Sequence, residues 1–216
     1  MYNIIIDCGH GGKDSGAIGL DIREKDYTLI IGKKIKEILK DYNCNVLLTR
    51  STDKFLSLEE RCQFSNNNNG EIFISIHCNA HTNQSANGFE SYSYNGNRLQ
   101  DVLHETIIKR VNIKDRGKKK NNFYVLKNTK CSACLLELGF ITNKQDSEIL
   151  NENIYEFSYA ISKAIIDYLS LKQIDNRDLY RVCVGSYINK DNANNMLKQL
   201  EKDGYKPFIL KATIWL

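Results

Sequence analysis

Short apolar runs alternate along the chain with longer segments whose apolar residues recur at helical spacing. The apolar runs and extended patterns predict strands at 4–6, 45–49, 72–76, 88–94, 133–138 and, more briefly, 123–126. The helical spacing predicts amphipathic helices over 26–41, from Ser57 to the Asn tract at 66–69, over 99–111 and over 154–169. Apolar strands separated by amphipathic helices predict an α/β fold, with a mainly parallel central sheet and helices on both faces.

The pattern changes near Ser170, where the polar segment 171–178 predicts a linker. Beyond it, residues 179–187 alternate like a strand, residues 193–200 have helical spacing and residues 205–215 are again extended. We therefore expect a first domain over 1–170 and a small C-terminal β-α-β unit over 179–216. A unit of that size is too small to build a good core of its own.

Composition narrows the class of protein. The chain has 216 residues, of which 42% are hydrophobic and 26% charged, which are ordinary values for a globular domain. It has no apolar run of about 18 residues, so we expect no membrane partner. The segment 1–7 lacks the basic start of a secretory signal, so we expect synthesis in the cytoplasm without a signal peptide.

The net charge of +4 is mildly basic and falls short of the clustered charge that nucleic-acid binding needs. We therefore expect no nucleic-acid partner. One basic cluster exists, and we interpret it as a solvated loop: Lys114, Arg116, Lys118, Lys119 and Lys120.

Cysteine usage indicates free thiols rather than disulfides. The chain has seven cysteines, an odd number, and a mid-sized domain does not need disulfide staples. Cys131 and Cys134 have CxxC spacing, but a structural zinc site needs a second such pair. We expect both of them to be packing residues.

Residues suited to metal chemistry follow the predicted strands. His10 comes after the first strand, His77 after the third and Glu137 at the end of a later one, while Glu24 precedes the first long helix. Because ligands of open α/β sheets bind beyond the carboxyl ends of the strands, we expect these four side chains to converge. The alternative is that each histidine is an ordinary packed or hydrogen-bonded residue. We expect His81 in a loop and His104 on a solvated helix flank.

Two imidazoles and one carboxylate, with the fourth position left to water, form the ligand set of a catalytic zinc site. A further carboxylate that is not a ligand can then act as the general base. Glu137 fits that role because it lies at an apolar strand end, where an unpaired charge is costly.

Seven motifs then occur in order along residues 2–170: DCGHGGKDSG at 7–16, EKD at 24–26, LTR at 48–50, SLEER at 57–61, SIHCNA at 75–80, GFE at 88–90 and LLELGFITN at 135–143. Together they resemble the zinc-dependent N-acetylmuramoyl-L-alanine amidases. The resemblance implies one Zn²⁺ per chain on His10, Glu24 and His77. It also implies hydrolysis of the amide between N-acetylmuramic acid and L-alanine in bacterial peptidoglycan, by zinc-activated water with Glu137 as general acid and base.

Two departures from the family pattern adjoin the expected ligands. Cys8 and Cys78 occupy positions that are often alanine in the family, and neither removes a ligand. Because neighbours on a strand point to opposite faces, we do not expect their thiolates at the metal.

Two rival functions stay open at this point. One is a non-catalytic wall-binding protein that keeps the amidase shape, which the retained ligands and Glu137 argue against. The other is a zinc peptidase acting on other peptides. In the amidase interpretation, without a signal peptide, we expect the chain to reach the wall after lysis, by a phage or by a sporulating mother cell.

The C-terminal segment resembles half of the SPOR module, which binds the glycan chains of peptidoglycan. The likeness lies in YRVCVGSY at 180–187 and ANNMLKQLEKDG at 193–204. The family module contains the β-α-β unit twice, whereas one copy occurs here. We therefore expect residues 179–216 to bind the wall or to form a homodimer with a second copy. The alternative is that this unit packs on its own catalytic domain.

Overall fold

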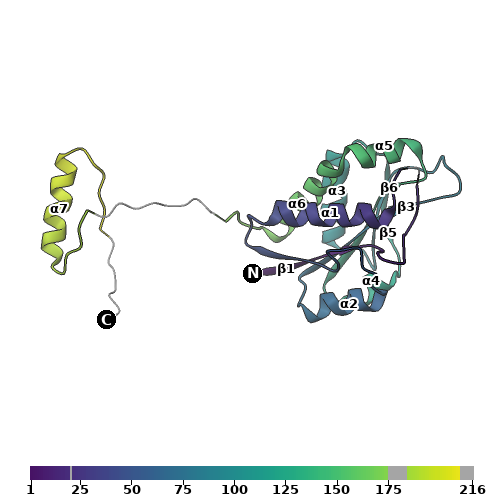
Figure 1. Ribbon diagram of the computed structural model, residues 1–216, viewed down its shortest axis with the longest axis horizontal. Helices are drawn as coiled ribbons and strands as arrows, with labels where there is room; N and C mark the ends of the chain where they lie inside the picture. The colour runs from purple at the N-terminus through teal and green to yellow at the C-terminus, as the bar shows by residue number, and fades with distance from the viewer. Residues whose placement is uncertain (20, 175–183, 210–216) are drawn as a thin grey trace. The chain divides into compact units, whose positions relative to one another are not determined.

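The computed structural model describes residues 1–19, 21–174 and 184–209 (Figure 1). It contains two compact units, Met1–Asp175 and Asn176–Leu216. None of the helices in the described ranges is long and apolar enough to cross a membrane.

The first unit is built on one sheet of six strands in the order β2-β1-β3-β6-β4-β5. The strands are β1 (Tyr2–Cys8), β2 (Cys44–Leu48), β3 (Ile72–Asn79), β4 (Phe89–Ser93), β5 (Asp115–Lys120) and β6 (Ser132–Phe140). Every neighbouring pair is parallel except β4 and β6, which are antiparallel. The prediction of a mainly parallel sheet is confirmed.

Helices cover both faces of this sheet, as expected (Figure 1). One face carries α1 (Glu24–Leu39), α3 (Arg98–Arg110) and α6 (Ile154–Leu169), with α5 (Lys144–Glu152) near its edge. The opposite face carries α2 (Leu58–Asn67) and α4 (Tyr124–Asn128). We call these the α1/α3/α6 face and the α2/α4 face.

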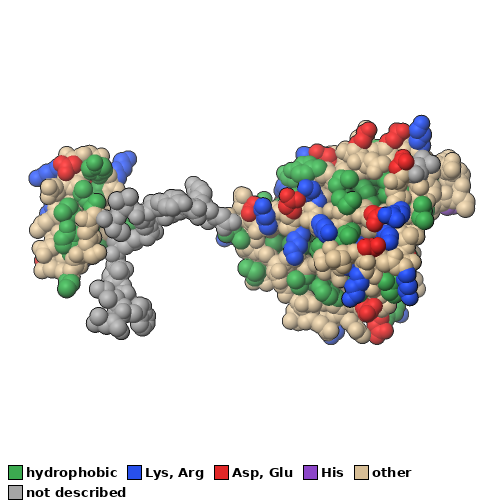
Figure 2. Space-filling model, viewed as in Figure 1, with side chains coloured by type: hydrophobic (Ala, Val, Ile, Leu, Met, Phe, Trp, Pro, Cys, Tyr) green, Lys and Arg blue, Asp and Glu red, His purple; other side chains and the backbone are tan. Residues whose placement is uncertain are grey.

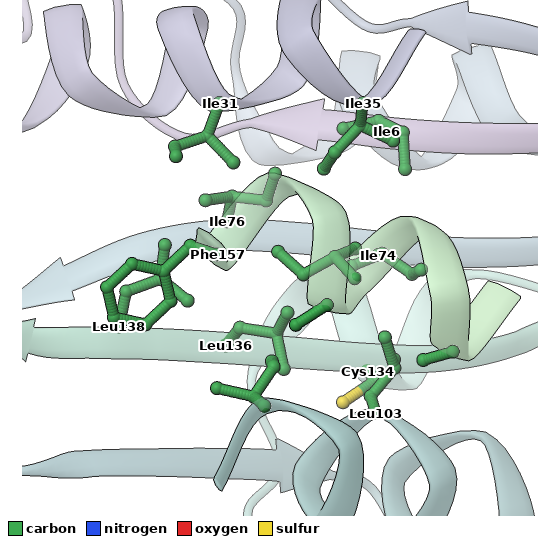
Figure 3. Close-up of a cluster of buried hydrophobic side chains, with 14 of the residues drawn as sticks. Ile6, Ile31, Ile35, Ile74, Ile76, Leu103, Cys134, Leu136, Leu138 and Phe157 are labelled. Atoms are coloured by element: carbon green, nitrogen blue, oxygen red, sulfur yellow. The ribbon is translucent and has the colours of Figure 1, made fainter. Parts of the chain in front are cut away.

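The two faces bury apolar cores of different size. On the α1/α3/α6 face, the strands contribute residues such as Ile6, Ile74 and Leu136, which pack with Ile31 of α1 and Phe157 of α6 (Figure 3). The α2/α4 face has a smaller cluster, made of Ile5, Cys62, Phe73, Val125, Leu126, Ala133 and Leu135. The smaller cluster leaves part of that face available for chemistry.

The basic cluster is not a solvated loop, so that prediction was wrong. Residues 115–120 form edge strand β5, which pairs with β4 in parallel. Acidic side chains offset the positive charge of this strand: Glu90 pairs with Arg116 and Lys119, and Asp101 pairs with Lys118. Charged side chains are common on edge strands, where they oppose pairing with other chains.

Three further differences concern local structure. Residues 124–128 form the short helix α4 rather than the extended segment predicted at 123–126. Helix α5 was not predicted. His104 is 3% exposed rather than solvated, because it bonds the Ser91 hydroxyl and the Asp115 carboxylate, at 2.8 and 2.9 Å.

The second unit contains helix α7 (Lys190–Lys202), close to the helix predicted over 193–200. The strand predicted at 179–187 falls largely outside the described residues. Where they are described, 184–187 and 205–209 form no strand. A strand is stable only beside a partner strand, and the described part of this unit supplies none.

Candidate active site

The loop after β1 places His10 at the carboxyl edge of the sheet. His10 has a φ of 59°, a left-handed conformation that non-glycine residues rarely adopt. The Arg61 Nη2 donates to the His10 carbonyl at 2.8 Å, and Asp14 Oδ2 lies 2.9 Å from the His10 Nδ1. Gly16 lies so close that a Cβ there would meet His10 Cδ2 and Glu24 Oε2, each at 2.6 Å. The loop therefore fixes the His10 ring with Nε2 turned inward.

Glu24 and His77 meet His10 at this edge, as the sequence predicts. The Glu24 Oε1 lies 3.0 Å from His10 Nε2 and 2.9 Å from His77 Nδ1. The two imidazole nitrogens are 3.1 Å apart. Backbone N–H groups hold the carboxylate in place, since Ala17 donates to Oε2 at 2.8 Å and Cys78 to Oε1 at 3.0 Å.

This arrangement fits a metal ion. Tetrahedral zinc with bonds of about 2.0–2.1 Å to its ligands has neighbouring donor atoms about 3.3 Å apart, close to the three separations here. Two imidazole nitrogens facing one carboxylate oxygen need a cation between them, either a proton or a metal. Burial lowers the pKa of His10, but the Glu24 and Asp14 carboxylates outweigh it and raise that pKa to about 8. The donor set therefore attracts positive charge strongly.

Glu137 lies beside the cluster of His10, Glu24 and His77 but is not part of it. It is paired in register with His77 on β3, so both side chains project from the same face of the sheet. Its Oε2 is buried with no hydrogen-bond partner among the described residues. Burial raises the pKa of Glu137 to about 7; His77 opposes the shift, while Glu24 and Glu90 add to it. A carboxyl group with a pKa near neutrality is suited to accept and return a proton.

Glu90, the next candidate for a base, has the opposite environment. It is paired in register with Glu137 across β4 and β6 and is also buried. Four side chains bond its carboxylate: Asn79, Tyr92, Arg116 and Lys119. Burial would raise the pKa of Glu90, but Lys119, Arg116 and Tyr92 hold it below its ordinary value. Glu90 is therefore a charged structural carboxylate, whereas Glu137 is an unpaired one.

A buried ion pair between Arg61 and Asp7 stabilises the loop that carries His10. Arg61 of α2 donates to Asp7 Oδ1 at 2.7 Å and to the Cys8 carbonyl at 2.8 Å. Thr49 and Ser75 complete the hydrogen bonds of Asp7. Sequence reasoning assigned no role to Arg61 or Asp14, although both lie within the quoted motifs.

A cleft of about 490 Å³ opens over these groups. His10, Glu24, His77 and Glu137 all line it. Its rim is apolar and partly exposed, with Phe55 at 37%, Leu58 at 54% and Tyr124 at 43%. The cleft therefore combines a polar floor with an apolar rim, as is usual for a ligand-binding site.

The remaining histidine and cysteines take no part in the cluster. His81 is exposed in a loop, as predicted. Cys8, Cys78 and Cys134 are buried in the core of the α1/α3/α6 face, and the cysteines in the described ranges are free. Cys183 lies outside the described residues.

Comparison with protein families gives two matches. Residues 4–167 match the N-acetylmuramoyl-L-alanine amidase model and residues 160–211 match the SPOR domain model. The N-acetylmuramoyl-L-alanine amidase CwlM of Bacillus licheniformis is 35% identical over 97% of this chain and 85% of its own length. The endolysin of Bacillus phage SPP1 is 39% identical over 78% of this chain and 66% of its own length.

Solved structures agree with these matches. The catalytic domain of the N-acetylmuramoyl-L-alanine amidase CwlV from Bacillus (Paenibacillus) polymyxa var. colistinus superposes with a TM-score of 0.77 at 34% identity, covering 80% of this chain and all of that one. The amidase AmiC2 of Nostoc punctiforme gives 0.76 at 38% identity, covering 78% and 97%. The chain belongs to the family of N-acetylmuramoyl-L-alanine amidases, and it hydrolyses the amide bond between N-acetylmuramic acid and L-alanine in peptidoglycan.

Proposed function

We propose that His10, Glu24 and His77 bind one zinc ion per chain and that Glu137 is the general acid and base of the amidase reaction. The observation that carries this proposal is the convergence of one donor atom from each of the three ligands within 3.1 Å, beside a buried carboxylate without a partner. Zinc held there would polarise the scissile carbonyl and lower the pKa of a water molecule.

The protein's own groups then have separate tasks. Asp14 orients the His10 ring by accepting from Nδ1, which leaves Nε2 as the ligand atom. Glu137, with its raised pKa, accepts a proton from the attacking water and delivers it to the departing nitrogen of L-alanine. The Oε2 of Glu137 is buried beside the cleft, so bulk water does not compete for it.

Metal content and product identity test this proposal together. The purified chain should contain one zinc per chain, a chelator should abolish hydrolysis of wall sacculi, and added zinc should restore it. His77→Ala should lose the metal, whereas His81→Ala, which removes an exposed histidine, should keep it. Active protein without zinc would reject the ligand assignment.

The products separate the rival functions. The amidase should release soluble peptide with new L-alanine N-termini, leaving the lactyl carboxyl group on the sugar. A non-catalytic wall-binding protein would release nothing, and a zinc peptidase would produce other N-termini.

We also propose that residues 1–170 form the catalytic domain, that 171–178 form the linker, and that 179–216 bind the wall or join two chains. In the described part of the second unit, α7 has no buried residue, and Ile188, Tyr205 and Phe208 are exposed. Hydrophobic side chains lie on the visible surface of this unit (Figure 2). Apolar side chains exposed in this way favour a partner. The likeness to the phage endolysin supports action on the wall at lysis.

Light scattering at micromolar concentration tests the homodimer. The full chain should have twice the monomer mass, and truncation after Ser170 should return it to monomer mass. A full chain with the monomer mass would reject the homodimer and leave wall binding as the proposed role of this unit.

A further inference from the structure

The cationic side chains of β5 lie next to the catalytic cleft, on a part of the sheet that no described helix covers. Lys119 is paired in register with Tyr92, and Tyr92 with Leu135, so these side chains project from the α2/α4 face. Helix α3 packs against β4 and β5 from the opposite face. The side chains of Arg116 and Lys119 are 30% and 36% exposed. They are therefore accessible to a ligand that extends out of the cleft.

The arrangement around Glu90 leaves positive charge in excess. Arg116 Nε donates to Glu90 Oε2 at 2.7 Å, and Lys119 Nζ donates to the same oxygen. Two cations thus share one carboxylate, which also accepts hydrogen bonds from Asn79 and Tyr92. Arg116 Nη2 makes no hydrogen bond within the described residues, and the ammonium of Lys119 has further N–H groups to donate. The pair can therefore bind a second anion without breaking its bonds to Glu90.

Two contacts connect this cationic pair to the catalytic groups. Glu90 is paired in register with Glu137, and Asn79, which donates to Glu90 at 2.8 Å, also lines the cleft. In addition, the Tyr92 ring lies between the Lys119 ammonium, at 5.7 Å, and the Phe123 ring of the cleft wall, at 5.2 Å. Arg116 and Lys119 are therefore linked by direct contacts to residues that line the cleft.

We propose that Arg116 and Lys119 form a subsite that binds a free carboxylate of the stem peptide, on the L-alanine side of the scissile amide. The proposal rests on the assignment of Glu137 as the catalytic group. The sugar side of the substrate carries no carboxylate, because the lactyl group is already bound in the amide. The peptide beyond L-alanine carries free carboxylates, and a guanidinium binds a carboxylate with matched geometry.

The opposite side of the cleft fits the other half of the substrate. Phe55, Leu58 and Tyr124 form its partly exposed apolar rim. Apolar and aromatic surfaces suit the uncharged faces of sugar rings. The substrate would therefore lie across the cleft with its glycan toward α2 and α4 and its peptide toward β4 and β5.

A matched pair of muropeptides tests the subsite. The two substrates differ only at the residue after L-alanine, whose carboxylate is either free or converted to the carboxamide. We expect the wild-type enzyme to prefer the free carboxylate by about 10-fold in kcat/KM, which is the lower end for hydrogen bonds to charged groups. Arg116→Gln and Lys119→Gln should each lower this ratio toward one, and Arg116→Lys should keep more of it than Arg116→Gln.

Lys118→Gln is the matched control. Lys118 lies on the same strand and is 38% exposed, but it pairs with Asp101 of α3 on the other face, so its loss should leave the ratio unchanged. Each single test substitution keeps one cation on Glu90, and thermal unfolding checks that the variants fold. An unchanged ratio in folded Arg116→Gln and Lys119→Gln would overturn the subsite alone. Near-normal activity of Glu137→Gln on the same muropeptides would instead reject the assignment of Glu137 on which the subsite rests.

Discussion

The two faces of the sheet differ in what their side chains do along the same strands. On the α1/α3/α6 face, β3 presents Ile72, Ile74 and Ile76 and then Cys78, all buried and apolar. On the α2/α4 face, the same strand presents Phe73, then Ser75 and His77. Along β3, the side facing α1, α3 and α6 is therefore apolar throughout, whereas the side facing α2 and α4 changes from apolar to polar toward the carboxyl end.

The same change occurs on the neighbouring strands. On the α2/α4 face, β1 changes from Ile5 to Asp7 and β6 from Leu135 to Glu137. Toward the carboxyl ends of the strands, this face therefore carries Asp7 beside Ser75 and, two residues farther along, His77 beside Glu137, and the cleft lies over these groups. The comparison indicates a division of roles. The α1/α3/α6 face, or apolar face, stabilises the fold. The α2/α4 face, or mixed face, holds a site whose groups are individually costly to bury.

Removing the carboxylate of Glu137 should have the largest effect on activity. Glu137→Gln keeps the side-chain shape but removes the basic group, so we expect kcat to fall by roughly 10²- to 10⁴-fold. The measurement is single-turnover hydrolysis of a muropeptide, with metal content determined on the same sample. Zinc should remain bound, because Glu137 is not among the three donors.

The unfolding midpoint of this variant is the complementary readout. Because the Glu137 Oε2 is buried without a partner, Glu137→Gln should not lower stability. If the activity of Glu137→Gln were near normal, the general base would lie elsewhere, and Glu90 would be the next residue to test.

Removing Arg61 should destabilise the mixed face most. Burial would raise the pKa of Asp7, but the Arg61 guanidinium and the Ser75 hydroxyl hold it below its ordinary value, so the carboxylate stays charged. Arg61→Met would leave that buried charge without its cation, and we expect a loss of about 3–5 kcal/mol of unfolding free energy. Urea denaturation measures it.

Lys34→Met is a control that removes an exposed cation, and it should change stability little. Equal effects of the two substitutions would contradict the view that burial makes the Asp7–Arg61 pair sensitive.

A cavity on the apolar face should reduce stability without changing catalysis. Leu136 is fully buried and follows Leu135 on β6, but its side chain lies on the opposite face from Glu137 (Figure 3). Leu136→Ala should cost about 2–5 kcal/mol of unfolding free energy. Below the unfolding transition its KM and kcat should match the wild type. A drop in kcat as large as that of Glu137→Gln would show that the two faces do not act separately.

The central strands, and the convergence of His10, Glu24 and His77 at one edge of the sheet, could be predicted from the sequence for the same physical reason. Strands β1, β3 and β6 are buried on both sides, so their apolar runs are conspicuous, and parallel strands bring His10, His77 and Glu137 to one edge. Residues at strand ends could therefore be assembled without coordinates. The metal itself and the roles of these residues remain proposals.

Edge strand β5 shows why the rest could not be predicted. Its residues 115–120 are mostly charged, and its pairing depends on backbone bonds to β4 and on Glu90 and Asp101, which lie elsewhere in the sequence. The solvated flank predicted for His104 was wrong for a related reason, since Asp115, one of its two partners, belongs to this strand. Helix α4 is too short to show helical periodicity.

The smallest expected effect concerns the start of α2, which carries Arg61 and the rim residue Leu58. Ser57 and Glu60 form a capping box: the Ser57 hydroxyl accepts from the Glu60 N–H at 3.2 Å, and Glu60 Oε2 accepts from the Ser57 N–H at 2.7 Å. Ser57→Ala removes the first of these bonds and should cost about 1 kcal/mol of unfolding free energy. Ser57→Asp, which can still cap the helix, should restore most of it. Because α2 lies on the mixed face, Ser57→Ala should also raise the KM for muropeptides slightly while leaving kcat unchanged. If Ser57→Ala lowered stability as much as Arg61→Met, the first turn of α2, rather than the buried ion pair, would be the main support of this face.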